Sequence, residues 1–260
     1  MTNMGEKAPF ASNPFIKTIA TNLAQVEDRI QAACRSAGRR REEVAIVAVT
    51  KGRSPAEMAG AFRCGLQALG ENRIEELEAK RPILEADIAP GRPEWHVIGH
   101  VQSRKAERVA ASADLIHSVD SVRLAERLER AAATGGRRLP VLLQVNVSGE
   151  ASKSGFAAQT PADREALLEI IETLRGLPHL DIEGLMTIAP LTPESGLVRD
   201  VFRRTRMLLE HIREIFPDRE WAVLSMGMSG DFELAIEEGA TLIRVGRALF
   251  EPLLRRGDTA

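Results

Sequence analysis

The sequence predicts a single α/β domain, a (β/α)8 TIM barrel with an extra helix before its first strand. Eight short apolar runs follow one another along the chain, and the gap after each run is long enough for a helix. The runs are continuous rather than alternating, which is typical of parallel strands covered on both faces. A length of 260 residues is normal for one such barrel.

The expected strands are the apolar runs 44–49, 66–69, 95–98, 115–119, 141–147, 180–186, 221–226 and 241–245. The expected barrel helices are 55–63, 74–86, 103–111, 122–132, 161–174, 198–215, 232–237 and 247–253. An amphipathic helix over 14–37 precedes them, because apolar residues recur at helical spacing and Gly38 ends the pattern. We expect one domain over 13–260 and a disordered tail over 1–12.

The alternative architecture is a doubly wound open sheet, but the GxGxxG fingerprint is absent after the first expected strand. A net charge of −2 gives no basic field for nucleic acid or an anionic membrane. There is no apolar span of membrane length and no N-terminal apolar run of signal length. Cys34 and Cys64 are not closely spaced, and no Cys/His cluster has metal-ligand spacing. We expect a cytoplasmic protein with reduced thiols, no metal site, and neither a nucleic-acid nor a membrane partner.

Lys51 directly follows the apolar run 44–49, at the end of the first expected strand. Active groups in barrels of this kind lie at the carboxyl ends of the strands. Only six of the 35 basic residues are lysines, and arginine stays protonated and so cannot form an imine. At the mouth of the barrel the amine is expected to be partly desolvated, which frees it for attack on a carbonyl. The alternative is an ordinary solvated lysine at a strand end.

A candidate phosphate cradle follows the seventh expected strand. Ser229 and Gly230 lie where the next helix begins, and small or hydroxyl residues there present backbone N–H groups to an anion. Alternatively, Asp231 and Glu233 cap this helix without a bound anion.

Arg244 and Gly246 lie at the end of the eighth expected strand, where TIM barrels often complete a phosphate site. Gly246 lets the backbone approach an anion closely. Arg244 interrupts an apolar strand and needs an acceptor, either Glu71 or Asp120 in a salt bridge or the ring nitrogen of a ligand. A lysine, an anion cradle and an arginine are what pyridoxal 5′-phosphate (PLP) needs, as imine partner, phosphate site and ring-nitrogen partner.

Eight segments between residues 15 and 250 also carry a resemblance to a known family. They are AVTKGRS (48–54), GENRIEE (70–76), WHVIGHVQSRK (95–105), IHSVDS (116–121), QVNVSGEASKSGF (144–156), GLMTIAP (184–190), LSMGMSGDFELAIEEGAT (224–241) and IRVGRALF (243–250). In these segments the sequence resembles the pyridoxal phosphate homeostasis proteins. Their fold is similar to the N-terminal barrel of alanine racemase, which is fold type III among PLP proteins.

The resemblance implies that Lys51 holds PLP as a Schiff base and that Arg244 faces the pyridine nitrogen. The other cofactor-binding residues that it implies are Asn72, Asn146, Met226, Ser229, Gly230, Gly246 and Arg247. Lys153 matches a second lysine of the family, proposed for PLP transfer, and is otherwise a solvated loop residue.

The sequence departs from the family pattern at a few positions. Arg53, Arg73 and Glu251 stand where the family commonly has lysine, tyrosine and glycine. Arg247 replaces a small hydroxyl residue, and it either adds a charged bond to a phosphate or points to solvent. These departures leave Lys51 and Arg244 in place.

Two functions remain open. One is a carrier that buffers PLP or delivers it to apo-enzymes without turnover; the other is a PLP-dependent amino-acid racemase. A racemase needs a proton donor on each face of its intermediate, and alanine racemases use a tyrosine there, from a C-terminal β domain. This chain has no tyrosine, so His100, His117 or Cys64 would have to replace it. We expect a carrier without catalytic residues, and a monomer because no β domain supplies the racemase-type interface.

Overall fold

The structure is a computed structural model, and it describes residues 13–150 and 153–251. The tail predicted for residues 1–12 lies outside this part of the chain, as do the last two residues of the helix expected over 247–253. The helix expected over 14–37 is present as α1.

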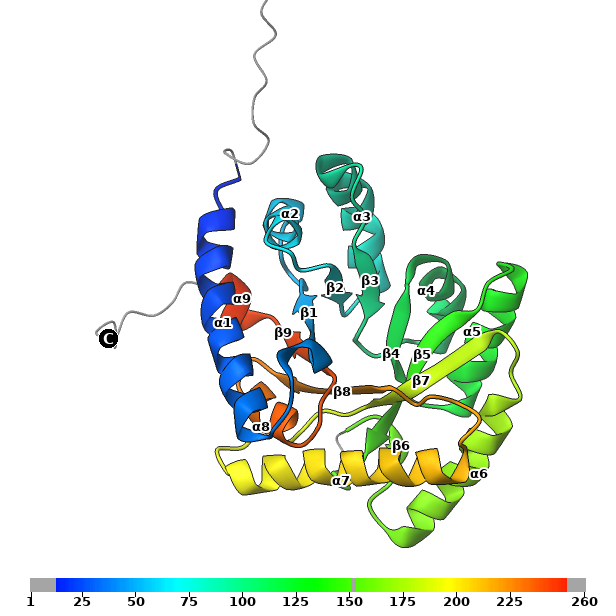
Figure 1. The fold of residues 1–260 in the computed structure, drawn as a ribbon. Helices are drawn as coiled ribbons and strands as arrows, with labels where there is room; N and C mark the ends of the chain where they lie inside the picture. The colour runs from blue at the N-terminus through cyan, green and yellow to red at the C-terminus, as the bar shows by residue number, and fades with distance from the viewer. Residues whose placement is uncertain (1–12, 151–152, 252–260) are drawn as a thin grey trace, which may run out of the picture.

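The strands form a closed parallel barrel surrounded by helices (Figure 1). They are β1 Ala45–Val49, β2 Ala68–Glu71, β3 Glu94–Val97, β4 Leu115–Val119, β5 Leu139–Asn146, β6 Phe156–Ala157, β7 Leu180–Met186, β8 Val223–Met228 and β9 Leu242–Val245. The pairings of β1 with β9 and of β4 with β5 complete the ring, while β6 adds only a short pairing to β5. The predicted barrel is confirmed, and the two-residue strand β6 is an element that the sequence did not indicate.

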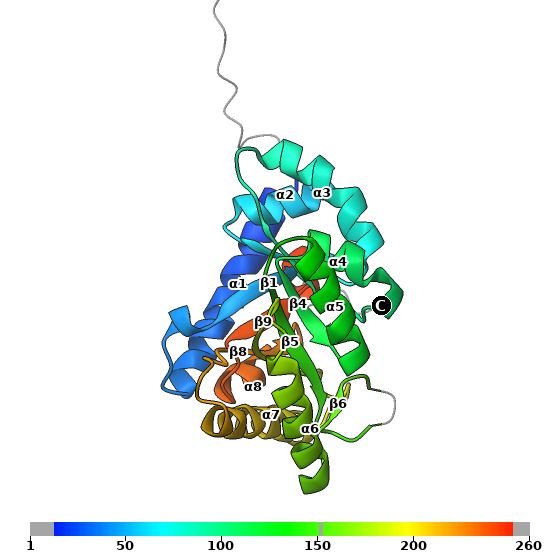
Figure 2. The same cartoon turned by 90° about the vertical axis from the view of Figure 1, so that its right-hand side faces the viewer.

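The helices follow the strands in the predicted order. They are α1 Ile16–Ser36, α2 Pro55–Arg63, α3 Ile74–Ile88, α4 Ala106–Ser112, α5 Val122–Thr134, α6 Pro161–Arg175, α7 Ser195–Ile215, α8 Phe232–Glu237 and α9 Arg247–Phe250, with 3₁₀ turns η1 Arg41–Glu43 and η2 Ser103–Lys105. Figure 2 shows α4, α5 and α6 following one another along one side of the barrel.

Local sequence explains where several helices begin. Ser54 accepts a hydrogen bond from the backbone N–H of Glu57, whose side chain bonds back to Ser54, and proline takes the first helical position of α2. Thr160 and Asp163 form the same capping box at the start of α6. These caps fix the direction in which the chain leaves the strand ends.

The apolar core has two parts. The larger part lies between the strands and the surrounding helices, whereas a small cluster fills one layer inside the barrel. The small cluster consists of Val47, Leu115, Leu142, Met186 and Leu242. The barrel interior also holds buried polar side chains, among them His96, His117, Ser225 and Arg244. Interiors of such barrels are normally apolar, so this polar content calls for a physical explanation.

Helix α1 lies against α8 and α9 on the outside of the barrel (Figure 1). The Asn22 side chain donates to the carbonyls of Leu249 and Glu251, both at 2.9 Å. The Arg29 guanidinium stacks 4.3 Å from the Phe232 ring and donates to the Ser229 carbonyl at 3.3 Å. The extra helix therefore braces the chain segments that follow β8 and β9.

Candidate functional site

A cavity of about 870 Å³ opens at the carboxyl ends of the strands. Seven of the residues that the sequence singled out for a cofactor line it, namely Lys51, Asn72, Ser229, Gly230, Arg244, Gly246 and Arg247. Lys153 and His100 also line it. Because parallel strands present their carboxyl ends on one rim, residues far apart in sequence meet there.

Lys51 is exposed at the rim of the cavity, in a tight turn directly after β1. The turn is closed by a hydrogen bond from the Arg53 N–H to the Thr50 carbonyl at 2.9 Å. Gly52 adopts a φ of 70°, a left-handed conformation that costs glycine little. The turn carries Lys51 past the packed end of the strand, where the residue is exposed and lines the cavity; partial desolvation of its amine stays a prediction.

A buried ionic network lies beneath this turn. Lys80 Nζ donates to the Thr50 carbonyl at 3.1 Å, to Glu71 at 2.8 Å and to Glu76 at 2.9 Å. Glu76 in turn accepts from the Gly52 N–H at 3.1 Å. The network thus holds the backbone on both sides of Lys51.

Arg244 is 4% exposed, and its guanidinium has no carboxylate within ion-pair distance among the described residues. It donates to Ser225 Oγ at 2.6 Å and to the Thr187 carbonyl at 2.9 Å. The salt bridge considered from the sequence is not formed, since Glu71 pairs with Lys80 and Asp120 with His100. Burial lowers the pKa of Arg244 to about 10, so it remains a cation at neutral pH.

Ser229 ties the segment after β8 to the segment after β9. Its Oγ accepts from the N–H groups of Gly246 at 3.2 Å and Ala248 at 3.3 Å. Those two N–H groups converge on one oxygen, which is the arrangement by which backbone amides hold a phosphate. A Cβ at Gly246 would approach the Val49 Cβ to 3.2 Å, so a side chain there would crowd the strand next to Lys51.

The acidic residues after β8 are occupied locally. The Asp231 carboxylate accepts from the Met228 N–H at 2.5 Å, and Glu233 forms an ion pair with Arg29 at 2.6 Å. Burial raises the pKa of Asp231. Asp231 is the N-cap residue of α8, but its side chain closes the preceding turn and makes no capping hydrogen bond, so the capping alternative is not formed. The N–H groups of Gly246 and Ala248 remain directed at Ser229.

Two predicted ligand residues do not reach the cavity. Met226 is fully buried in the core, whereas Met228 lines the cavity. The pairing of β8 with β9 shifts register between Ser225 and Met228, and Gly227 has a φ of 91°, so the regular alternation of sides is lost.

Asn146 also lies outside the cavity lining. Its amide donates to the carbonyls of Glu150 at 2.9 Å and Lys153 at 3.4 Å, and its carbonyl accepts from the Gly149 N–H at 3.1 Å. Asn146 therefore shapes the loop that brings Lys153 to the cavity. Its contact with a cofactor stays a prediction.

The cavity wall includes residues that the sequence did not single out. The segment after β7 and the start of α7 contribute Ile188, Pro190, Leu191, Thr192, Pro193, Ser195 and Val198. His100, which the sequence offered as a proton donor, lies on the same wall, with its Nδ1 2.9 Å from Asp120, which orients the ring. An irregular loop carries no periodic signal, so sequence patterns could not place it.

The other candidates for a second proton donor lie elsewhere. His117 is fully buried and bonded to Ser225 and His96. Cys64 is half-buried with its thiol 3.8 Å from the Ile16 carbonyl, burial raises its pKa, and it does not line the cavity. Both cysteines are free.

The described residues hold no group of three or more His, Cys, Asp or Glu side chains able to bind a metal ion. Within the same part of the chain, no helix is both long and apolar enough to cross a membrane. What converges at the cavity instead is the amines of Lys51 and Lys153, the buried Arg244 cation with no described carboxylate in ion-pair range, and a pair of backbone N–H donors. This donor set fits a ligand with a carbonyl carbon, a ring acceptor and a phosphate.

Comparison with known proteins first defines the class. A family model described as the alanine racemase N-terminal domain matches residues 21–252. Alanine racemase from Streptomyces coelicolor, 18% identical with a TM-score of 0.68, covers 90% of this chain and 58% of its own, and shares the fold. The protein is therefore an alanine racemase N-terminal-type barrel.

Sequence relatives define the family more narrowly. The pyridoxal phosphate homeostasis protein of Pseudomonas aeruginosa is 41% identical over 235 residues, 90% of this chain and 96% of that protein. The protein of the same name from Escherichia coli is 37% identical over 235 residues, 89% and 95% of the two chains. The chain belongs to the pyridoxal phosphate homeostasis protein family.

Solved structures agree with this assignment. PipY of Synechococcus elongatus, determined without PLP, is 36% identical with a TM-score of 0.78, covering 89% of this chain and 99% of that one. The PipY structure with PLP bound has a TM-score of 0.75 at the same identity and coverage.

Proposed function

We propose that this protein binds PLP covalently through Lys51 and buffers it or delivers it to apo-enzymes, without turnover of its own. The observation that carries the proposal is the convergence of Lys51, Arg244 and the Ser229–Gly246 contact on one cavity. They come from β1, β8 and β9, and few ligands need an amine, a ring-nitrogen partner and a phosphate cradle together. The family names and the PLP-bound PipY structure support the same ligand.

Each residue has a distinct task in this proposal. Lys51 supplies the amine that attacks the ligand's aldehyde, and its exposure leaves it accessible to incoming and departing PLP. Arg244 presents a fixed cation to the ring nitrogen, and the N–H groups of Gly246 and Ala248, with Ser229, receive the phosphate. Asn72, Gly230 and Arg247 line the same cavity and complete the ligand's surroundings. When bound, PLP supplies an electrophilic carbonyl and an electron-withdrawing ring.

Carriage without turnover is favoured by what surrounds Lys51. A guanidinium at the ring nitrogen keeps that nitrogen unprotonated, which weakens the ring as an electron sink. The sequence has no tyrosine to act as the opposing acid. An exposed, accessible lysine suits exchange of PLP with solvent and with other proteins more than it suits catalysis in a closed site.

Borohydride trapping tests the anchor directly. The purified protein is mixed with PLP, reduced with sodium borohydride, and digested for peptide mapping by mass spectrometry. We expect the pyridoxyl mass on Lys51, together with a near-visible absorption band before reduction that Lys51→Ala abolishes. Lys17→Ala, which removes an exposed lysine of α1, is the matched control and should keep the band.

A label on Lys153 in place of Lys51 would show that the loop lysine is the anchor. A label spread evenly over several lysines would show that no specific site exists. Delivery is measured by mixing the PLP-loaded protein with an apo PLP-enzyme and following recovery of that enzyme's activity, against free PLP at equal concentration.

A racemase is the second candidate, and the His100–Asp120 pair favours it. This pair places an oriented imidazole on the cavity wall that contains Lys51. Incubation of the PLP-loaded protein with single L-amino acids, followed by chiral chromatography, separates the two functions. Sustained D-product that disappears in His100→Asn would replace the carrier with an enzyme.

Four finer features belong to the same proposal. We place the barrel as one domain over 13–260, acting as a monomer in the cytoplasm with transient contacts to apo-enzymes. Sedimentation of the PLP-loaded protein tests the monomer, and a stable dimer at micromolar concentration would contradict it.

A further inference from the structure

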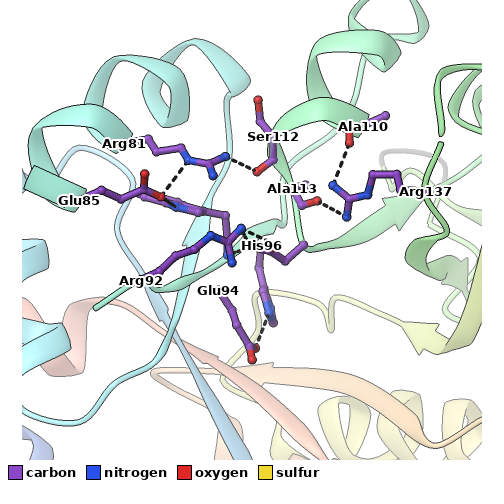
Figure 3. Close-up of polar contacts among 11 residues, drawn as sticks. Arg81, Glu85, Arg92, Glu94, His96, Ala110, Ser112, Ala113 and Arg137 are labelled. Carbon is purple, nitrogen blue, oxygen red and sulfur yellow. Dashed lines mark hydrogen bonds and ion pairs between the residues drawn. The ribbon is translucent and has the colours of Figure 1, made fainter. Parts of the chain in front are cut away.

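A chain of polar side chains crosses the barrel interior from the cavity to the opposite end. Arg244 donates to Ser225 Oγ at 2.6 Å, and Ser225 Oγ lies 2.9 Å from His117 Nδ1. His117 Nε2 lies 3.0 Å from His96 Nδ1. His96 Nε2 then faces Glu94 at 3.6 Å, at the amino end of β3 (Figure 3). A buried cation at one end is thereby linked to an exposed carboxylate at the other.

The number of hydrogen-bond donors in this series of polar side chains fixes which atom donates and which accepts at each contact. A guanidinium can only donate, so Ser225 Oγ accepts from Arg244 and keeps its own proton to give. His117 Nδ1 is its hydrogen-bond partner among the described residues, so this nitrogen accepts. A buried hydroxyl proton without an acceptor would cost free energy, which disfavours the opposite tautomer.

The direction continues through both imidazoles. Burial, followed by His96 and Arg244, holds the pKa of His117 well below its usual value, so His117 carries one proton. That proton lies on Nε2 and is donated to His96 Nδ1, which leaves the proton of His96 on Nε2, toward Glu94. The interaction with His96, 3.6 Å away, is the main reason that the pKa of Glu94 is lowered.

We propose that Ser225, His117 and His96 are positioning residues that fix the Arg244 guanidinium for a ligand in the cavity. The proposal rests on the proposed function, because PLP is that ligand. Ser225 and the Thr187 carbonyl together hold two of the guanidinium nitrogens, so the plane of the group is set before a ligand enters. His117 and His96 keep Ser225 Oγ turned as an acceptor toward Arg244.

The chain also makes the cavity sensitive to the far end of the barrel. A second proton on His96 would place an N–H opposite the N–H of His117 and force the His117–His96 and Ser225–His117 links to reverse. Ser225 would then accept from both neighbours and its own proton would have no partner. A proton taken up beside Glu94 would therefore alter the hydrogen bonding of Ser225, the residue that holds Arg244.

The charged groups around that far end are few in the described residues. Glu94 lies beside Arg92 and Asp114, which pair with each other at 2.8 Å (Figure 3 labels Arg92 and Glu94). Glu183 and Asp181 of β7 are further acidic groups there; burial and then Asp181 raise the pKa of Glu183, and His96 opposes that rise. His117, by contrast, is fully buried and faces Arg244, and these surroundings hold its pKa well below the usual value.

The first test needs neither PLP nor a mutation. Histidine is labelled with ¹⁵N, and long-range proton–nitrogen correlation spectra assign the tautomer of His96 and His117 in the ligand-free protein. We expect both rings to be neutral and protonated on Nε2 at neutral pH. A proton on Nδ1 of either ring would contradict the proposed direction of these hydrogen bonds, independently of whether the protein binds PLP.

The second test asks whether the chain acts on the ligand. Ser225→Ala removes the link between Arg244 and His117, and we expect PLP to bind about tenfold more weakly, as for loss of one charged hydrogen bond. The pH dependence of the PLP absorption band should also shift. Thr205→Val is the control, because it removes another fully buried hydroxyl, which bonds only to its own helix.

The outcomes separate the two proposals. If Ser225→Ala binds PLP with wild-type affinity and pH dependence while the tautomers are as expected, the positioning role is wrong and the PLP site stands. If the wild-type protein does not bind PLP, the proposed function fails, and the tautomer spectra still decide whether the chain exists.

Discussion

Two buried charges near strand ends of this barrel have opposite surroundings. Glu71, the last residue of β2, is fully buried and bonded to Lys80 and Thr50, both at 2.8 Å. Arg244 of β9 is almost as buried but bonds only to a hydroxyl and a carbonyl, and it lines the cavity. A buried charge that is already paired maintains the fold, whereas a buried charge without a counter-ion is available to a ligand.

The largest expected effect on stability comes from removing Lys80, the partner of the buried Glu71 carboxylate. Lys80→Met keeps the length of the side chain but leaves Glu71 buried without its cation. We expect a loss of about 3–5 kcal/mol in the free energy of unfolding, the usual cost of removing one partner of a buried pair. Urea unfolding followed by circular dichroism measures it.

The double variant Glu71→Gln with Lys80→Met is the control for this experiment, and it should recover part of the loss because no buried charge is then unpaired. A loss below about 1 kcal/mol for Lys80→Met alone would mean that water reaches Glu71 and that the pair is not structural.

Removal of the unpaired charge, Arg244, should have the opposite balance of effects: a small loss of stability and a clear loss of PLP affinity. Arg244→Met strands only the neutral acceptors Ser225 and Thr187, so we expect unfolding to become easier by about 1–2 kcal/mol. PLP affinity should fall by tenfold or more on the same scale of one charged hydrogen bond. Absorbance titration with PLP and urea unfolding, run on the same samples, measure the two quantities.

Arg213→Met is the matched control for Arg244→Met. Arg213 donates to a carbonyl, that of Trp221, at 3.0 and 2.6 Å, and lies outside the cavity. It should affect stability to a similar extent and leave PLP binding unchanged. Equal loss of PLP binding in both variants would remove the distinction between the two kinds of buried charge.

The smallest effect concerns the carboxylate under the Lys51 turn. Hydrogen bonds from Lys80 and from the Gly52 N–H lower the pKa of Glu76. The stabilisation is therefore present above the unfolded value of about 4.3 and is lost as the pH falls through the lower folded value. Glu76→Gln should be less stable than wild type by under about 1 kcal/mol at pH 7. The difference should shrink in acid, measured by urea unfolding across pH; a constant difference would contradict the ionic contribution.

Much of the fold follows from local physics. The eight long strands were predictable because each is buried on both faces and therefore reads as a continuous apolar run. The strand expected over 66–69 lies instead at Ala68–Glu71, since the buried Glu71 is kept in the strand by Lys80, a partner from the next helix. Helix α7 begins at Ser195, earlier than expected, because serine and glycine there resemble a loop in sequence.

The site was predictable where it depends on strand ends and unpredictable where it depends on register. Lys51, Ser229, Arg244 and Gly246 meet at one rim as expected. Met226 lies buried outside the cavity lining, because a bulge at Gly227 brings Met228 there instead, and its contact with a cofactor stays a prediction. The link from His96 through His117 to Ser225 joins three strands, and no spacing along the chain signals contacts of that kind.

The pairing of β1 with β9 determines when, during synthesis of the chain, the binding site can form. The lysine is supplied by the first strand and the arginine by the last, and the pairing of Ala45–Ala48 with Leu242–Val245 brings them together. During synthesis on the ribosome, Lys51 is therefore made long before Ser229 and Gly246, which form the phosphate cradle. The complete pocket forms only after β9 has been synthesised, and a product that stops before β9 lacks both the strand that closes the barrel and the ring-nitrogen partner.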